Sequence, residues 1–399
     1  MPRIVRDPLA QGRLTTPLAL LVTLAAAIGT SATYPLLPAV SDVAQTLDTS
    51  VSVTGLALGS GPFGYFCGLG LVVPLVDRLN PRYLLGVLFG VLAAALASAA
   101  IVGSAWQLAV TGVMVGAMSA VGAALSSLVG RLASPDRRAT QLGVVTAGIS
   151  AGIIAGRFVG GWLTDLLGWR EMLLVYALAS LITAVALTVS VPASRARSAD
   201  SYWRTLAGLP GLLRLHPLRL AAARGACWFL AFCAMWAGIA VALSRPPFAY
   251  SAEHIGYYAA AGLLGIPATQ LAGRLTDRVG ARTVLVGGLA LASLALLSLA
   301  FVLPCPPAVI LCLAVFDAGT FAAQVANQST VLAIDPEAPA RYNSAYMMVF
   351  FIGGSLGTAL AAPSVEWLGW TATALTLVVA IAAALVLSLG RSWYGDVPR

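Results

Sequence analysis

Long uncharged stretches alternate with short polar segments along this chain of 399 residues. A membrane-spanning helix needs about 20 consecutive apolar residues, and the uncharged stretches divide into spans of about that length. In the first half, the predicted spans are residues 17–40, 52–76, 82–103, 105–130, 139–166 and 170–191. In the second half, they are residues 219–243, 254–275, 282–303, 306–333, 341–363 and 369–391. The pattern therefore predicts twelve transmembrane helices.

Composition and charge agree with a membrane protein. Hydrophobic residues make up 59% of the chain and charged residues 10%, which is too few to cover the surface of a water-soluble fold. With both termini in the cytoplasm, Arg170 and Arg245 are the only loop arginines that fall outside, as expected for loops enriched in positive charge on the cytoplasmic side. The net charge of +8 thus indicates orientation in the membrane and not nucleic-acid binding.

Two loop segments repeat at a fixed distance. PLVDRLNPR at residues 74–82 and RLTDRVGAR at residues 274–282 align Asp77, Arg78 and Arg82 with three residues 200 positions later. The later residues are Asp277, Arg278 and Arg282. Each segment follows the second span of its half, which indicates a duplicated unit. We expect a six-helix bundle over residues 1–191, a polar cytoplasmic linker over 192–218 and a second bundle over 219–399.

These loops, with RPPF at residues 245–248, NQS at 327–329 and RYNSAYMMVFFIGGSLGT at 341–358, carry a family resemblance. The sequence resembles the major facilitator superfamily, and within it the twelve-helix bacterial drug or metabolite:proton antiporters of the arabinose-efflux-permease type. The second loop matches the superfamily signature from Gly273 to Arg282, whereas the first has Val73 and Asn80 in place of glycines. The resemblance implies an all-α membrane fold of two pseudo-symmetric six-helix bundles.

The signature loops are the candidate gating elements. They place acidic and basic side chains at helix ends on the predicted cytoplasmic face, where such side chains could bridge neighbouring helices in one conformational state. The alternative is that they only anchor the loops by positive charge. The gating candidates are Asp77, Arg78, Arg82, Gly273, Asp277, Arg278 and Arg282.

Glycines recur every four residues in the fifth span, at Gly148, Gly152, Gly156 and Gly160. This spacing exposes backbone along one helix face, so that another helix can approach closely. The run resembles the antiporter signature GxxxGPxxGG, with Arg157 in the proline position. Both tight packing and a role in coupling fit this pattern.

Asp317 is the acidic residue deepest in a predicted span, and intramembrane charges usually face a cavity or a partner. It shares a helix face with Thr320, Gln324 and Gln328, and Arg157 lies at similar depth in the other half. We predict a proton-coupling and substrate pathway from these five residues, with a static ion pair as the alternative.

Aromatic side chains supply the candidate substrate contacts because they offer large contact area at small entropic cost. Contact with lipid or a neighbouring helix is the alternative, and snorkelling to the interface is expected for Arg224. The candidates are Tyr34, Trp228, Phe232, Trp236, Tyr346 and Phe350.

Together these features predict a monomeric secondary transporter that exports a small hydrophobic or amphipathic organic compound by proton antiport, with alternating access. The expected partners are this substrate, protons and the lipid bilayer, and no cofactor, metal or catalytic residue is expected. An uptake symporter or a facilitator remains open as an alternative. A membrane enzyme or receptor on the same scaffold is a further one, although no catalytic constellation is visible.

Overall fold

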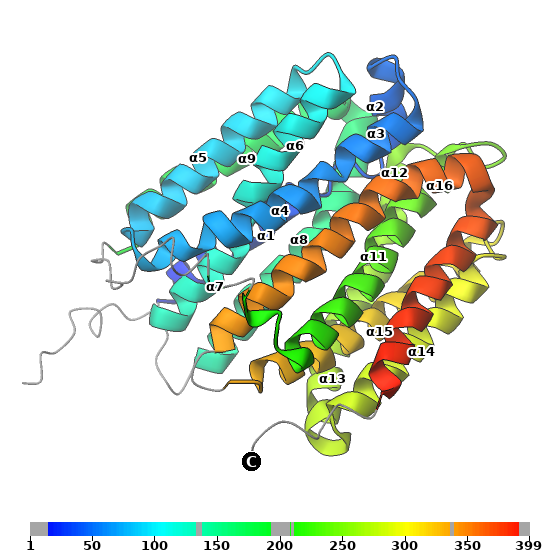
Figure 1. Cartoon of the computed structure of the whole chain (residues 1–399). Coiled ribbons are helices and arrows are strands. Elements are labelled where there is room, and N and C mark those ends of the chain that lie inside the picture. Colours follow the sequence, from blue (N-terminus) through cyan, green and yellow to red (C-terminus); the bar gives the residue numbers. More distant parts are fainter. Residues whose placement is uncertain (1–14, 133–137, 193–207, 209–210, 336–338, 391–399) are drawn as a thin grey trace, which may run out of the picture.

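The structure is a computed structural model that describes residues 15–132, 138–192, 208, 211–335 and 339–390. Its first half consists of helices joined by short connections (Figure 1). They are α1 (Thr16–Ser31), α2 (Val40–Thr46), α3 (Val51–Leu58), α4 (Ser60–Leu71), η2 (Val73–Asp77), α5 (Pro81–Ala100), α6 (Ala105–Ser119), α7 (Val121–Leu132), α8 (Arg138–Leu167) and α9 (Trp169–Ser190).

The second half is helical as well. Its helices are α11 (His216–Ser244), α12 (Ala252–Tyr258), η3 (Ala259–Leu264), α13 (Gly265–Val279), α14 (Ala281–Leu299), α15 (Pro306–Leu332) and α16 (Pro339–Leu389). The non-helical backbone of Gly369, with φ 79°, divides α16 into the last two predicted spans. Most of the predicted linker 192–218 lies outside the described residues, and α11 begins at His216, inside the end of that range.

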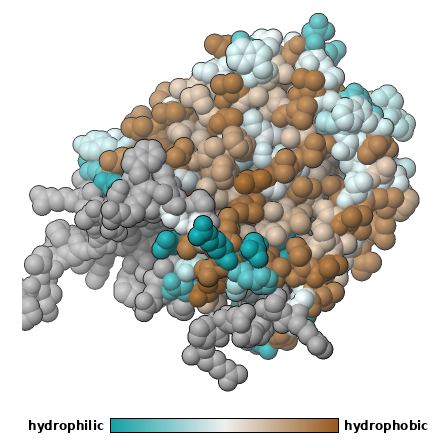
Figure 2. Space-filling model, viewed as in Figure 1, coloured by the Kyte–Doolittle hydropathy of each residue, from teal (hydrophilic) through white to brown (hydrophobic). Residues whose placement is uncertain are grey.

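Helix occupies each of the twelve predicted spans, and the all-α membrane fold is confirmed. Within the described ranges, nine helical segments are long and apolar enough to cross a membrane, and one of these contains both of the last two predicted spans. The eighth span consists of three pieces, because the 3-10 segment η3 separates α12 from α13. Figure 2 shows hydrophobic side chains over most of one flank, as a lipid-facing surface requires.

The first span is shorter than predicted. We expected a helix over residues 17–40, but α1 ends at Ser31 and a series of turns leads to α2. Pro35 and Pro38 fall in this stretch, and proline lacks the N–H group that continues a helix. The break places Tyr34 in a turn between two helices instead of within one.

Buried apolar side chains form two main clusters, one drawn almost wholly from residues 18–191 and the other from residues 218–384. The α3 and α4 helices lie along α16, where the two halves meet (Figure 1). The α8 helix meets α12 and η3 in the second contact between the halves. These two contacts position the candidate site.

Small residues bring matching helices together in both halves. A methyl group at Gly148 or Gly156 of α8 would come within 2.6 Å of a carbonyl oxygen of Thr23 or Ser31, in or at the end of α1. In the second half, Gly353 and Gly357 of α16 lie in the same way against carbonyl oxygens of α11. The repeat seen in the loops therefore extends to the packing of its first and fifth spans.

Candidate functional site

Arg157 occupies the middle of the interface between the two halves. Its side chain is 5% exposed, although it projects from α8 within a membrane span. Three aromatic rings surround the guanidinium, with Cζ at 4.4 Å from the ring centre of Trp236, 5.1 Å from that of Tyr34 and 5.9 Å from that of Phe232. Such contacts attract a cation to the faces of aromatic rings.

Asp317 of α15 lies close to this cluster and is 2% exposed. The indole Nε1 of Trp236 donates a hydrogen bond of 3.1 Å to its Oδ1. Its Oδ2 faces Gly262 in η3, where an added Cβ would lie 2.9 Å away. The backbone of η3, between two α-helical segments, thus comes directly against the carboxylate.

Arg157 and Asp317 line one small cavity between the halves. Its volume is about 10 Å³, close to the space of one water molecule. Within the described part of the chain, Arg157 forms no hydrogen bond or ion pair, and its enclosed Nε has no partner. The two opposite charges are therefore neighbours that do not touch.

The polar stripe of α15 divides between two places. Asp317 faces the cavity, whereas the hydroxyl of Thr320 bonds back to its own helix. Gln324 accepts a hydrogen bond of 2.9 Å from Tyr346, and Gln328 donates one of 2.8 Å to Asn343. Gln324 and Gln328 thus hold α15 to α16.

Arg224 corrects the sequence interpretation. Snorkelling was expected, but its side chain is 2% exposed and donates to Oδ1 of Asn327 through Nε and Nη2. Asn327 in turn donates to the backbone oxygen of Ala221 and to the hydroxyl of Tyr346. The NQS run at 327–329 was the available signal, because an amide that deep in a span needs a partner.

The six aromatic candidates fall into two groups. Tyr34, Phe232 and Trp236 face Arg157. The other three lie with Phe229 in the core of the second half, where the rings of Phe229 and Phe350 stack at 3.8 Å. These three are Trp228, Tyr346 and Phe350.

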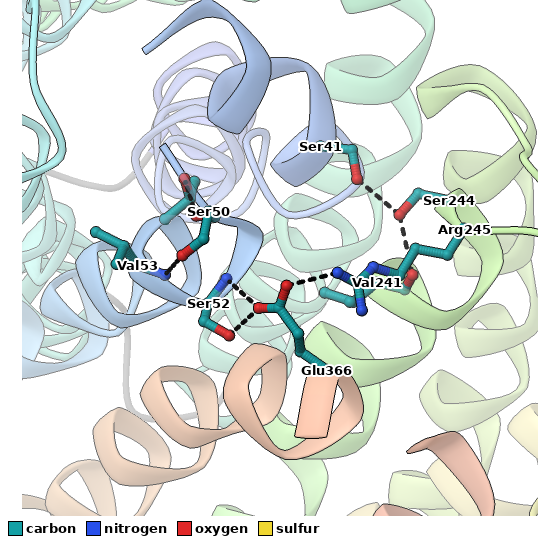
Figure 3. A network of polar contacts seen from close by, with 9 residues as sticks. Ser41, Ser50, Ser52, Val53, Val241, Ser244, Arg245 and Glu366 are labelled. Atoms are coloured by element: carbon teal, nitrogen blue, oxygen red, sulfur yellow. Dashed lines mark hydrogen bonds and ion pairs between the residues drawn. The ribbon is translucent and has the colours of Figure 1, made fainter. Parts of the chain in front are cut away.

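One end of the interface is tightly closed. The carboxylate of Glu366 in α16 accepts hydrogen bonds from the backbone N and the hydroxyl of Ser52, and it pairs with Arg245 at 2.6 Å (Figure 3). The hydroxyls of Ser41 and Ser244 also meet across the halves at 2.8 Å. Sequence reasoning noted Arg245 in the RPPF motif but did not select its partner Glu366, although Glu366 is the only acidic residue between the last two predicted spans.

The signature loops lie at the opposite end. Arg282 donates a hydrogen bond of 2.6 Å to the backbone oxygen of Leu389, in its own half. Asp277 and Arg278 are exposed, and nothing lies within 4 Å of a Cβ built on Gly273. In the first half, Asn80 caps α5 by accepting from the backbone N of Arg82, Arg78 is half-buried, and the side chain of Asp77 lies outside the described part.

Among the described residues, no group of three histidine, cysteine or acidic side chains could hold a metal ion. The chemistry that the central cavity offers is that of one carboxylate, one guanidinium and aromatic rings in a low-dielectric setting.

Comparison with known proteins identifies the family. The family model described as Major Facilitator Superfamily matches residues 19–358 and 248–398. The chain belongs to the major facilitator superfamily. It is 32% identical to the probable transporter SCO4007 of Streptomyces coelicolor over 92% of this chain and 87% of that protein. It is also 28% identical to the uncharacterized transporter YgaY of Escherichia coli O157:H7, over 91% and 92% of the two chains.

Solved structures agree on the superfamily fold. A bacterial homologue of the human lysosomal transporter Spinster, inward-facing and unoccupied, superposes with a TM-score of 0.76 at 16% identity, over 93% of this chain and 96% of that one. The nucleoside transporter NupG gives a TM-score of 0.75 at 15% identity, over 94% and 100%. This major facilitator protein is thus a multi-pass membrane transporter, as its sequence predicted.

Proposed function

We propose that this major facilitator transporter is a proton antiporter that exports a small hydrophobic or amphipathic organic compound across the bacterial inner membrane. Both termini and the signature loops lie in the cytoplasm in this proposal, because the loop arginines are concentrated on that side. The end closed by Glu366 and Ser52 then faces outward.

The observation that carries the proposal is the buried carboxylate of Asp317 at the interface of the halves. A carboxylate in a membrane span is costly unless it has a function or a partner, and Asp317 has no direct ion pair among the described residues. Its position lets it bind a proton from whichever side the cavity opens to. Substrate and proton would then alternate at one site.

The geometry of the two ends supports alternating access. Hydrogen bonds across the halves gather around Glu366 and Ser41, whereas at the other end Asp277 is exposed and no described atom lies within 4 Å of a Cβ built on Gly273. Transport would require the Glu366 end to separate as the signature loops come together, which is a rocking of two packed bodies.

Transport in membrane vesicles with an imposed pH gradient tests the proposal. A panel of hydrophobic and amphipathic compounds is measured with the parent protein and with Asp317→Asn. We expect the variant to lose accumulation against a gradient and to retain exchange at equal pH on both sides. Asp165→Asn is the matched control, because this exposed carboxylate lies in α8, away from the cavity.

Three outcomes contradict the proposal in different ways. Gradient-driven accumulation by Asp317→Asn at the parental rate would exclude Asp317 as the coupling group. Substrate accumulation driven by inward proton flow, with substrate and protons moving in the same direction, would show uptake by symport. Movement that ignores the pH gradient in the parent would show a facilitator.

A further inference from the structure

Trp236 contacts both charges of the central site. Its ring lies 4.4 Å from the guanidinium carbon of Arg157, and its Nε1 donates at 3.1 Å to Asp317. The side chain is 4% exposed and projects from α11, which is buried over most of its length. One rigid indole therefore holds a cation by its face and an anion by its edge.

Direct pairing of the two charges would be the ordinary arrangement. Arginine and carboxylate form short, often bidentate hydrogen bonds when they meet, and these two side chains line the same cavity. Yet no such contact joins them in the described structure, and the Nε of Arg157 has no partner. The guanidinium lies over three aromatic rings instead, an arrangement that arginine favours.

We propose that Trp236 is a positioning residue, which sets the proton affinity of Asp317 by donating one hydrogen bond to its carboxylate and by holding Arg157 out of contact. The inference rests on the proposed function in that Asp317 is the proton site. It assigns Trp236 a different role from the substrate contact that its sequence position indicated.

Two substitutions separate the two parts of this role. Phenylalanine at position 236 keeps a ring against Arg157 but removes the N–H donor, and indole is a donor only. A hydrogen bond to an ionised carboxylate stabilises its charged form, so Trp236→Phe should make Asp317 bind protons more tightly. Trp236→Leu removes the donor and the ring together, which also frees Arg157 to approach the carboxylate.

The measurement is the protonation of Asp317 in the whole protein, reconstituted in lipid nanodiscs and followed by infrared difference spectroscopy of the carboxyl C=O stretch across pH. The band of Asp317 is the one that Asp317→Asn removes. This readout needs no substrate and no transport. A purely packing role for Trp236 would leave the midpoint of this titration in place.

We expect the midpoint in Trp236→Phe to move to more alkaline pH by about one unit, which corresponds to about tenfold tighter proton binding. The midpoint in Trp236→Leu should lie below that of Trp236→Phe, because Arg157 then pairs with the carboxylate. Trp228→Phe is the matched control, since this buried tryptophan lies in the same helix and its Nε1 has no partner.

The outcomes discriminate clearly. An unchanged midpoint in Trp236→Phe overturns the donor role, and a midpoint in Trp236→Leu at or above that of Trp236→Phe overturns the holding of Arg157. A titration without any band sensitive to Asp317→Asn contradicts the proposed function and this inference together. If the titration midpoint of Asp317 shifts in Trp236→Phe but the parent protein does not couple transport to protons, the proposed function is wrong and the role of Trp236 stands.

Discussion

Arg224 donates two hydrogen bonds to the side-chain oxygen of Asn327, through Nε at 3.1 Å and through Nη2 at 2.8 Å. The two residues lie 103 positions apart, on α11 and α15. Asn327 also donates at 3.3 Å to the hydroxyl of Tyr346 on α16. A single buried network therefore ties three helices of the second half together.

Arg224→Lys should destabilise the protein. Lysine keeps the charge but is a point donor without the planar fork, so it cannot reproduce both bonds to Asn327. Loss of a hydrogen bond to a charged group is worth about 1.5–3 kcal/mol, and we expect a clear fall in the thermal unfolding midpoint in detergent. Arg278→Lys serves as the control because Arg278 is exposed. Equal midpoints in the two variants would contradict a structural role for the network.

Arg224 also shows where sequence reasoning stops. Hydropathy locates a residue along the membrane normal, and it places Arg224 near one end of the predicted span 219–243. It does not determine which side of the helix faces lipid, so snorkelling and burial against Asn327 look alike in the sequence. The partner lies in another helix, and only the packing of α11 against α15 brings it near.

The central site was more predictable than this network. Asp317 and Arg157 are conspicuous because charges are rare in spans, and both line the central cavity. Their lack of direct contact could not be foreseen, because it depends on which side chains the packing of α8, α11 and α15 brings around them. The all-α membrane fold followed from hydropathy, since apolar length is what the bilayer requires.

The glycine face of α8 offers a test of packing. At Gly156, even a Cβ would lie 2.6 Å from the backbone oxygen of Ser31, so Gly156→Leu must push α1 away. We expect overpacking to cost about 1–3 kcal/mol, seen as reduced yield and a lower unfolding midpoint. Gly143→Leu is the matched control in the same helix, because nothing lies within 4 Å of its Cβ position. Similar losses at both positions would show that a bulky residue anywhere in α8 is harmful.

The second signature loop should affect turnover and not folding. Asp277 is exposed in the closed arrangement of the Glu366 end, so its contacts must form in another state if it acts in gating. Asp277→Asn is expected to reach the membrane at parental levels, to unfold at the parental midpoint and to transport more slowly. Parental transport rates would leave positive-charge anchoring as the function of this loop.

Ser41 and Ser244 allow a direct test of whether the Glu366 end must open. Their hydroxyl oxygens are 2.8 Å apart across the two halves, close enough for paired cysteines to form a disulfide. The double variant Ser41→Cys and Ser244→Cys is made after the five native cysteines have been replaced by alanine. Oxidation should lower transport to the level of empty vesicles, because the crosslink prevents the halves from separating at this end, and reduction should restore it.

Each single cysteine variant, treated with the same oxidant, controls for damage to the protein. If the fully crosslinked protein transports as fast as the protein with reduced cysteines, solute passes without separation of residue 41 from residue 244. The rocking of the two halves about the central site would then be wrong.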